Sequence, residues 1–509
     1  MDLKIVRQPL AINDAVYTGN AEIPVDEDYI LPDYHAEINK MLKCKVDGRV
    51  TSKSINGKSI TVDGHLCINI LYCDKNGQLN NYEHIAPFSK SIETSDDISG
   101  AITEARLKTE YCNCRVVTER KVSVHGALSL IINALVQKSY DVIADITDDE
   151  IQIDRKELPA LNAIGGSEKN MLLEEELVLS SGQPPIECIL RYTANPTVTE
   201  VKAMRNKAAI KGNLAVTVLY RCGSQCAVYK CTVPFSQFLD INGVFDECLC
   251  TAKAQLCYLE IKPKIGDGEI RSMMLNAKLS IIAQSYCDER IPIITDAYST
   301  DYEVSMKKTD MNIEKVLGHI SDTYMFKSTL EFNDSNINNI IDSWTETDIL
   351  GCDFSNGEIT VKANANICFL SNDTDERVSF FEKKVDLIYK KKVDYDCTGS
   401  LKCDAHLVPI SISYTLLSEC SIEYRIEYQV NLSLREVNHY AMLTDFSCDN
   451  KERKNKVNDC SLIIYYAQCG ERVWDIAKTY NSDVAQMREI NSLSADIIDN
   501  DRRILIPLF

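Results

Sequence analysis

A pattern of alternating apolar and polar residues occurs three times in this chain, at a spacing of about 150 residues. The three copies are residues 60–72, 208–220 and 359–369. An alternation of period two is typical of a β-strand with one buried face, because successive side chains point to opposite sides. A second alternating segment follows each copy, at residues 122–130, 274–281 and 426–434. The chain is therefore expected to contain three related all-β units.

A small residue occupies the same phase of the pattern in each copy, namely Gly64, Gly212 and Ala363. A small residue inside a long strand indicates a bend or a close approach of another backbone. Tripeptides downstream keep the same spacing: Pro87-Phe88-Ser89, Pro234-Phe235-Ser236 and Val385-Asp386-Leu387. Short segments 26 residues upstream of these small residues, around Ile38, Ile186 and Ile337, are expected to form one or two helical turns.

These repeats predict a mainly β fold of three tandem antiparallel units, each a sandwich or barrel-like module, with a small βααβ domain at the end. The predicted boundaries are 1–145, 146–298 and 299–447 for the units, 448–460 for a charged linker and 461–509 for the last domain. Residues 139–174 and 292–327 are expected to be ordered bridges between units, because they are too apolar for free linkers. Tandem copies of one β unit suit a scaffold with an extended or multivalent surface.

The charge balance excludes some partners. The 509 residues carry a formal net charge of −20, which disfavours binding to nucleic acid or to an anionic membrane surface. The longest apolar run, residues 127–136, is shorter than the ~20 residues that span a bilayer, so no transmembrane segment is expected. The N-terminus lacks the apolar stretch of a secretory signal, which predicts a cytoplasmic protein.

Cysteine is unusually frequent, with 21 residues. In a reducing compartment these residues are expected to be free thiols that pack as small hydrophobic side chains. Close groups such as Cys112 and Cys114 lack paired Cys-x-x-Cys spacing, so we expect no metal site and no cofactor.

The last 50 residues or so follow a different pattern. Residues 462–466 are expected to form a strand, 473–480 and 483–490 two helices, and 503–507 a second strand. Apolar residues at Val473, Ile476, Ala477 and Tyr480 follow helical spacing. Ser482 is expected to cap the second helix.

This order and its residues resemble a LysM domain. The matching residues are Tyr465 or Tyr466, Gly470, Trp474-Asp475-Ile476-Ala477, Tyr480, Asn491 and Ile504-Leu505-Ile506-Pro507. The resemblance implies binding of N-acetylglucosamine chains through the two loops beside the helices. The chain departs from the family pattern in both loops, at Glu471-Arg472-Val473 and at Asn500-Asp501.

Trp474 lies about 100° from the apolar stripe of its helix and shares a face with Lys478. An exposed aromatic residue beside a cation is typical of a binding hot spot. The alternative is that Trp474 packs against strands while Lys478 is solvated, and the sequence leaves both open. The candidate partner-binding residues are Glu471, Arg472, Trp474, Asp475, Lys478 and Asn491.

The combination of repeated β units and a LysM-like end looks like the SpoIVA-interacting protein L (SipL) family of endospore-forming bacteria. The resembling residues are Leu31-Pro32-Asp33, the strand around Val62-Asp63-Gly64 ending in Leu71-Tyr72, and Arg120-Lys121-Val122-Ser123-Val124. The resemblance implies a spore coat morphogenetic protein in the mother cell, at the forespore surface. Such a protein binds the coat ATPase SpoIVA through its LysM domain and helps to attach other coat proteins.

Two other function classes were considered. An enzyme is not expected, because the chain lacks Gly-x-x-x-x-Gly-Lys-Ser/Thr, Gly-x-Ser-x-Gly and His-Glu-x-x-His motifs and no catalytic residue stands out. The alternative to the scaffold is a cell-wall-associated protein whose LysM-like domain binds peptidoglycan, which would require export. Self-assembly through exposed strand edges is compatible with the scaffold.

Overall fold

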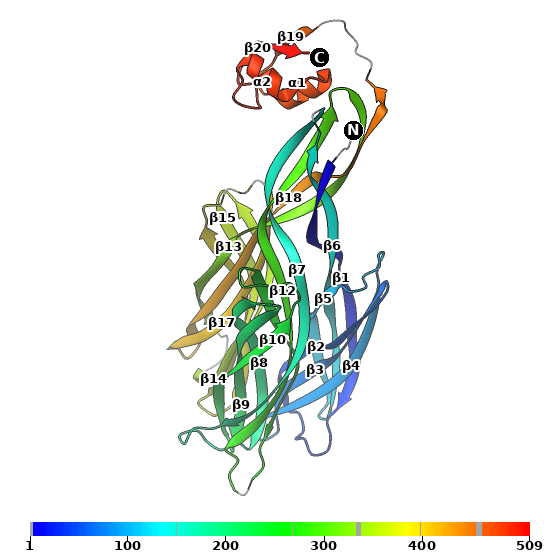
Figure 1. Ribbon diagram of the computed structural model, residues 1–509. Coiled ribbons are helices and arrows are strands. Elements are labelled where there is room, and N and C mark those ends of the chain that lie inside the picture. The colour runs from blue at the N-terminus through cyan, green and yellow to red at the C-terminus, as the bar shows by residue number, and fades with distance from the viewer. Residues whose placement is uncertain are drawn as a thin grey trace.

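The computed structural model describes residues 4–148, 150–266, 268–331, 337–395, 397, 399–454 and 461–508, and Figure 1 shows its arrangement. Most of these residues lie in antiparallel strands, and the two α-helices of the described residues are both in the C-terminal module. The predicted fold class, a mainly β chain with a small βααβ end, is confirmed. No described helix is both long and apolar enough to cross a membrane.

The long strands form three blocks of six. The first unit comprises β1 (Lys4–Ile30), β2 (Lys40–Asn56), β3 (Ser59–Cys73), β4 (Leu79–Glu93), β5 (Ile102–Thr118) and β6 (Lys121–Thr147). The second comprises β7 (Ile151–Val178), β8 (Cys188–Met204), β9 (Lys207–Cys222), β10 (Gln225–Asp240), β11 (Leu249–Pro263) and β12 (Ser272–Ser299). The third comprises β13 (Tyr302–Glu331), β14 (Ile337–Ser355), β15 (Glu358–Asp373), β16 (Val378–Lys392), β17 (Ser400–Ser418) and β18 (Ser421–Arg453).

Each unit is a sandwich of two three-stranded sheets with the same strand order. In the first unit the sheets are β2-β3-β4 and β1-β6-β5, and the other units repeat this order six and twelve strands later. The repeated sequence pattern forms the central strands β3, β9 and β15, whose alternate side chains are fully buried. Both faces of the central strands carry buried residues near one end, where units contact one another.

The small residue of the repeat lies beneath a large side chain of the neighbouring strand. Gly64 is opposite Phe88 and Gly212 is opposite Phe235, so each ring covers a position without a side chain. In the third unit Ala363 is opposite Leu387. The sequence alignment placed Asp386 at the phenylalanine position; the register shows that Leu387 occupies it, since a buried position requires the apolar residue.

The expected helical turns near Ile38, Ile186 and Ile337 are absent from the described residues. Each isoleucine is buried, and its backbone N–H donates to a carbonyl of the opposite sheet's hairpin region: Glu119, Ile270 and Glu419, respectively. A backbone N–H committed to another strand cannot close a helical turn. The first two segments lead into β2 and β8, and Ile337 begins β14.

The expected bridges are the ends of long strands that extend beyond the sandwiches, and these strands pair as β1 with β6, β7 with β12 and β13 with β18. Strands β1, β6, β7, β12, β13 and β18 have 27 to 33 residues and continue together into a narrow stem, visible above the body in Figure 1. The stem has an apolar interior with side chains from all six strands: Leu10, Val142, Leu158, Ile293, Met311 and Met442. Since this interior excludes water, the three strand pairs behave as one packed element.

The three units also meet in the body through equivalent residues. Leu71, Leu219 and Leu370, which occupy the same place in β3, β9 and β15, belong to one buried cluster. In the third unit Asp342 is buried and accepts from Arg191 Nη2 of the second unit at 2.6 Å. The guanidinium of Arg191 also lies 4.0 Å from the ring centre of Trp344.

One expectation about the cysteines is wrong. Cys44 of β2 and Cys114 of β5 face each other across the first sandwich and form a disulfide, with 6.2 Å between their Cα atoms. Cys112 precedes Cys114 by two residues on the same strand face, and its Sγ lies 3.6 Å from Cys114 Sγ. The sequence could not show this pairing because β2 and β5 are far apart in the chain.

The C-terminal module has the predicted strand, helix, helix, strand order. It consists of β19 (Leu462–Ala467), α1 (Val473–Tyr480), α2 (Val484–Asn491) and β20 (Arg502–Pro507). Asp483, rather than Ser482, caps α2 by accepting from Gln486 N. Ser482 is buried, and its hydroxyl donates to the Pro507 carbonyl at 2.6 Å.

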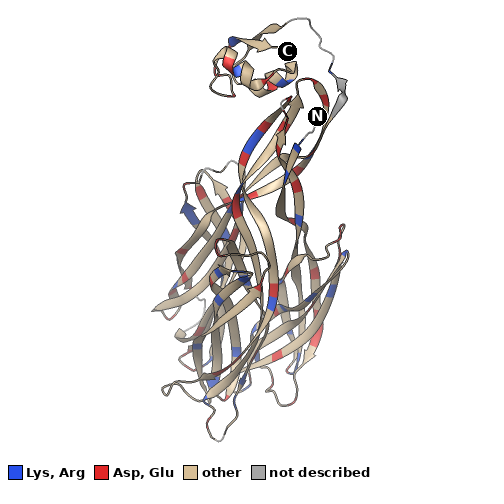
Figure 2. Cartoon of the chain, viewed as in Figure 1, with Lys and Arg blue, Asp and Glu red and all other residues tan. Residues whose placement is uncertain are grey.

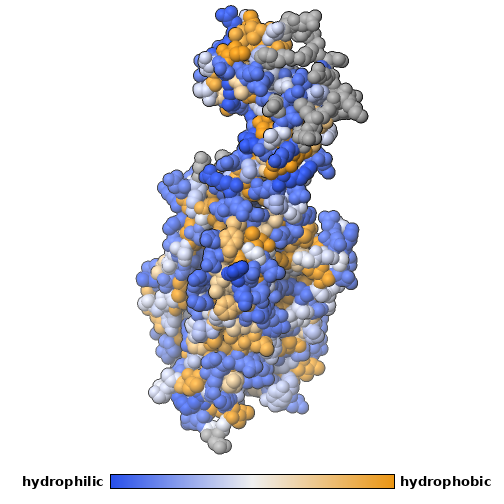
Figure 3. Space-filling model, viewed as in Figure 1, coloured by the Kyte–Doolittle hydropathy of each residue, from blue (hydrophilic) through white to orange (hydrophobic). Residues whose placement is uncertain are grey.

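Strand β18 pairs with β13 as far as Arg453, so it includes the first part of the expected linker 448–460. Residues 455–460 lie outside the described residues. Acidic and basic residues are intermixed over the body and the stem in Figure 2, and Figure 3 shows a mainly hydrophilic face with scattered apolar patches.

Candidate partner-binding site

The C-terminal module contacts the top of the stem through helix α1. Trp474 is 5% exposed, and its ring lies edge-on to the ring of Tyr298 of β12, with 5.1 Å between centroids. Both rings belong to one apolar cluster that also includes Val473 and Ala477. Of the two possibilities for Trp474, the structure has the packed one, with the stem as its neighbour.

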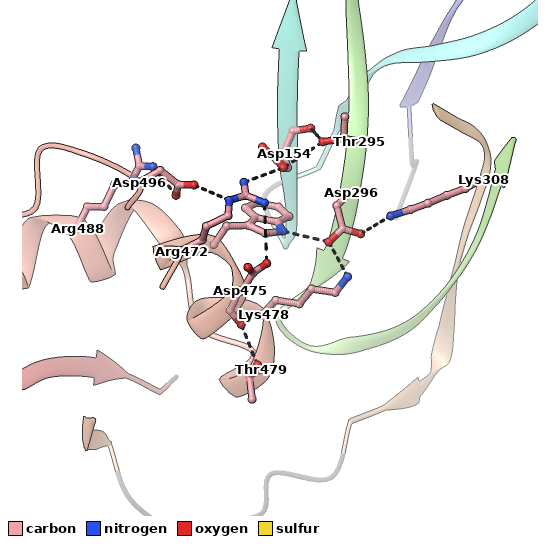
Figure 4. Close-up of polar contacts among 11 residues, drawn as sticks. Asp154, Thr295, Asp296, Lys308, Arg472, Asp475, Lys478, Thr479, Arg488 and Asp496 are labelled. Carbon is pink, nitrogen blue, oxygen red and sulfur yellow. Dashed lines mark hydrogen bonds and ion pairs between the residues drawn. The ribbon is translucent and has the colours of Figure 1, made fainter. Parts of the chain in front are cut away.

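Asp296 of β12 receives both polar groups of the helix. Its Oδ2 accepts from Trp474 Nε1 at 3.0 Å and from Lys478 Nζ at 2.6 Å, while Oδ1 accepts from Lys308 of β13 at 3.2 Å (Figure 4). Burial alone would raise the pKa of Asp296. The hydrogen bonds from Lys478 and Trp474 outweigh burial, and the pKa lies below its ordinary value of 3.8.

A second carboxylate lies beside the first. Asp154 of β7 is directly opposite Asp296 in the register of β7 and β12. Its Oδ2 accepts from Arg472 Nη2 and from the Thr295 hydroxyl, each at 3.0 Å. Arg472 also donates through Nε to Asp496 of the module at 3.0 Å. These carboxylates raise the pKa of Arg472, so the guanidinium is a permanent cation here.

Further hydrogen bonds extend the contact to the start of α2. The Tyr298 hydroxyl donates to the Ser482 carbonyl at 2.6 Å. Gln152 of β7 donates to Asp483 Oδ2 at 2.9 Å and accepts from Val484 N at 3.3 Å. The module is therefore fixed to the stem by apolar packing, ion pairs and other hydrogen bonds together.

The six candidate residues divide into three groups. Arg472, Trp474 and Lys478 come together on the stem side of the module; we call them the docking face. Asp475 is 65% exposed and lies beside this face, with its Oδ1 4.0 Å from Arg472 Nη1. Glu471 and Asn491 are internal supports: Glu471 accepts from the Tyr465 hydroxyl at 2.9 Å, and Asn491 bonds both backbone groups of Leu505.

The stem half of this contact was not foreseen from the sequence. Asp154 and Asp296 are 142 positions apart, and each is a polar residue in an ordinary alternating strand. Only the pairing of β7 with β12 makes them neighbours.

The module also has an exposed apolar strip away from the stem. Leu462, Ile464 and Tyr466 alternate along the outer face of β19, and they are 46%, 59% and 72% exposed. Side chains of the intervening residues Ile463 and Tyr465 pack into the module's core. This face is open in the structure, whereas the docking face is covered.

Two segments of the chain match a protein-family model described as SipL, SPOCS domain. The matched residues are 37–129, from just before β2 into β6, and 185–264, from just before β8 to the end of β11. These are equivalent parts of the first and second units. The match supports a SipL-like, sporulation-related protein. No curated protein and no solved structure matches the chain.

Proposed function

We propose that this chain is a non-enzymatic scaffold of the endospore coat that binds a SpoIVA-like coat ATPase through its C-terminal module, acting as a LysM domain. The observation that carries the proposal is the SPOCS match in two of the three units. The proposed place of action is the mother-cell side of the forespore surface, where other coat proteins would attach to the β units.

The architecture is suited to this role. The stem holds the module apart from the three sandwiches, so that a partner on the module leaves their outer surfaces accessible (Figure 1). Three equivalent units offer three related surfaces to further coat proteins, and multivalent attachment strengthens binding without new contacts. The module itself supplies an apolar strip and a cationic face.

A scaffold without catalysis also fits the central cavity. This space of about 830 Å³ lies where the three units meet and includes Lys45, Asp47 and Glu346. Lys45 Nζ lies 2.9 Å from Asp47 and 3.0 Å from Glu346, so one ammonium group pairs with both carboxylates. Charges satisfied in this way stabilise an interface and are poor general acids or bases.

The test is direct binding of the full chain to the purified SpoIVA-like ATPase of the same organism, measured by biolayer interferometry. We expect binding by the full chain and none by a chain that ends at Lys454, which retains all three units. Chitin oligomers are the competing ligand, and they are expected to have no effect. Undiminished binding by the shortened chain would move the partner site to the β units, and inhibition by chitin would favour the glycan-binding alternative.

A further inference from the structure

The carboxylates of Asp154 and Asp296 form an unusual pair on the stem. They are directly opposite each other on antiparallel strands, and each side chain is only 15% exposed. Like charges in this position repel, and partial burial strengthens the repulsion. Within the stem, Lys308 supplies a counter-charge to Asp296 alone. The pair is therefore a site of concentrated negative charge that cations from outside the stem would stabilise.

The docking face has the complementary chemistry. Arg472, Trp474 and Lys478 present a guanidinium, an indole N–H and an ammonium, all of which are hydrogen-bond donors without acceptor capacity. Each carboxylate receives at least one of these groups, and Asp296 Oδ2 receives two (Figure 4). Trp474 adds a flat apolar surface that packs on Tyr298 between the charges. Such a combination selects for carboxylates on an extended chain that also carries an aromatic residue.

We propose that the docking face is a receptor for paired carboxylates displayed on extended strands, and that the stem of the same chain occupies this receptor. A partner that uses the face must carry acidic residues on an extended segment and must displace the stem. The identity of that partner as the coat ATPase rests on the proposed function. The receptor itself is a property of this chain alone.

The covalent connection between stem and module makes the stem a strong competitor. A short connection gives an effective concentration of about 1 mM or more, so an external segment binds with an affinity reduced by the fraction of open molecules. Loss of the stem carboxylates should therefore strengthen partner binding. A purely structural contact would predict no such gain.

The first experiment uses two full-length variants. Asp154→Asn with Asp296→Asn removes both negative charges from the stem, and Arg472→Glu with Lys478→Glu reverses the docking face. Asn has nearly the same size as Asp, and the substituted side chains of the docking face are 34% (Arg472) and 37% (Lys478) exposed. Acrylamide quenching of Trp474 in a Trp344→Phe background reports release of the module, and Asp445→Asn, which removes an ion pair with Arg7 on the same stem, is the matched control.

Each variant alone is expected to show a several-fold rise in quenching and to sediment as a monomer. In a mixture, the intact module of the first binds the intact stem of the second, and sedimentation velocity shows a 1:1 complex at about 0.1 mM, below the concentration reached in cis. The control variant is expected to behave as the wild type. Unchanged quenching in both variants would refute the proposal that the docking face is a receptor. So would a mixture in which both variants have released modules but remain monomers.

The second experiment measures the ATPase. The Asp154→Asn, Asp296→Asn variant is expected to bind it at least about tenfold more tightly than the wild type, because self-occupation is removed. Weaker binding by this variant would mean that the stem helps to hold the partner, and it would overturn the competition. If neither the wild type nor this variant binds the ATPase while the mixed variants still associate, the receptor is supported and the proposal that the coat ATPase is its partner is refuted.

Discussion

A single methyl group added at Gly212 should destabilise the second unit, and a second substitution should relieve the effect. A Cβ at this position would lie 2.2 Å from Cζ of Phe235 and 2.5 Å from the carbonyl oxygen of Thr197. Neither distance is possible, so both the ring and a neighbouring strand must move. The third unit accommodates a Cβ at the equivalent position, because Ala363 is opposite the smaller Leu387 there and both are only 1% exposed.

The expected magnitudes follow from this geometry. Gly212→Ala overfills a packed core and should lower the free energy of unfolding by about 2–3 kcal/mol. Phe235→Leu alone leaves a void over the glycine and should cost about 1–2 kcal/mol. The double variant reproduces the alanine–leucine pair of the third unit, so its loss should be at least about 1 kcal/mol smaller than the sum of the two.

Urea unfolding of the full chain, followed by far-ultraviolet circular dichroism, measures these differences. Gly182→Ala is the control, because a Cβ there meets no atom within 4 Å, and it should change stability by less than about 0.5 kcal/mol. The reasoning is refuted if Gly212→Ala is as harmless as the control, or if the two single effects simply add.

Three further predictions concern other contacts. Asp342→Leu leaves the Arg191 guanidinium without its partner and should lower the free energy of unfolding by about 2–4 kcal/mol, measured from the unfolding midpoint. Adding Arg191→Leu should restore part of the lost stability. No recovery in the double variant would contradict the view that the loss comes from an unpaired buried charge. Asp296 contributes fully to docking above its ordinary pKa of 3.8, and this contribution is lost as the pH falls through the lower pKa of the docked state. Trp474 fluorescence should therefore shift only on acidification. A shift near neutral pH would argue against a role of the Asp296 carboxylate in docking. Reduction of the inter-sheet disulfide, which links residues 70 apart, should cost up to about 4 kcal/mol in thermal or urea unfolding, and Cys112→Ser should leave that effect unchanged.

The repeat and the module were predictable from local patterns. Alternation in residues 60–72 and its two copies identified the central strands, because a half-buried strand imposes period two on its own sequence. The helical spacing of Val473, Ile476, Ala477 and Tyr480 located α1 for the same reason. In both cases the structure depends on residues that are close in the chain.

The stem and the docking contact depend on distant residues, and the sequence was silent about them. Nothing local distinguishes a strand that ends with its sandwich from one that continues into a stem, so the sequence of residues 139–174 predicts only an ordered bridge. The role of Trp474 stayed open for a related reason. An indole beside a lysine suits either an exposed hot spot or a packed contact, and only Asp296 and Tyr298 of a remote strand determine which.

The six-stranded stem has a consequence for the order in which the protein forms. Its interior takes Leu10 from the first strand of the chain and Met442 from the last long strand, so its wall stays open until β18 has been synthesised. Each of the three sandwiches could fold as it emerges from the ribosome. The stem that joins them can be completed only when the chain is nearly complete. The module is the next segment to emerge, and it meets a finished stem. A prematurely terminated chain would instead expose the apolar side chains that β18 covers in the complete stem.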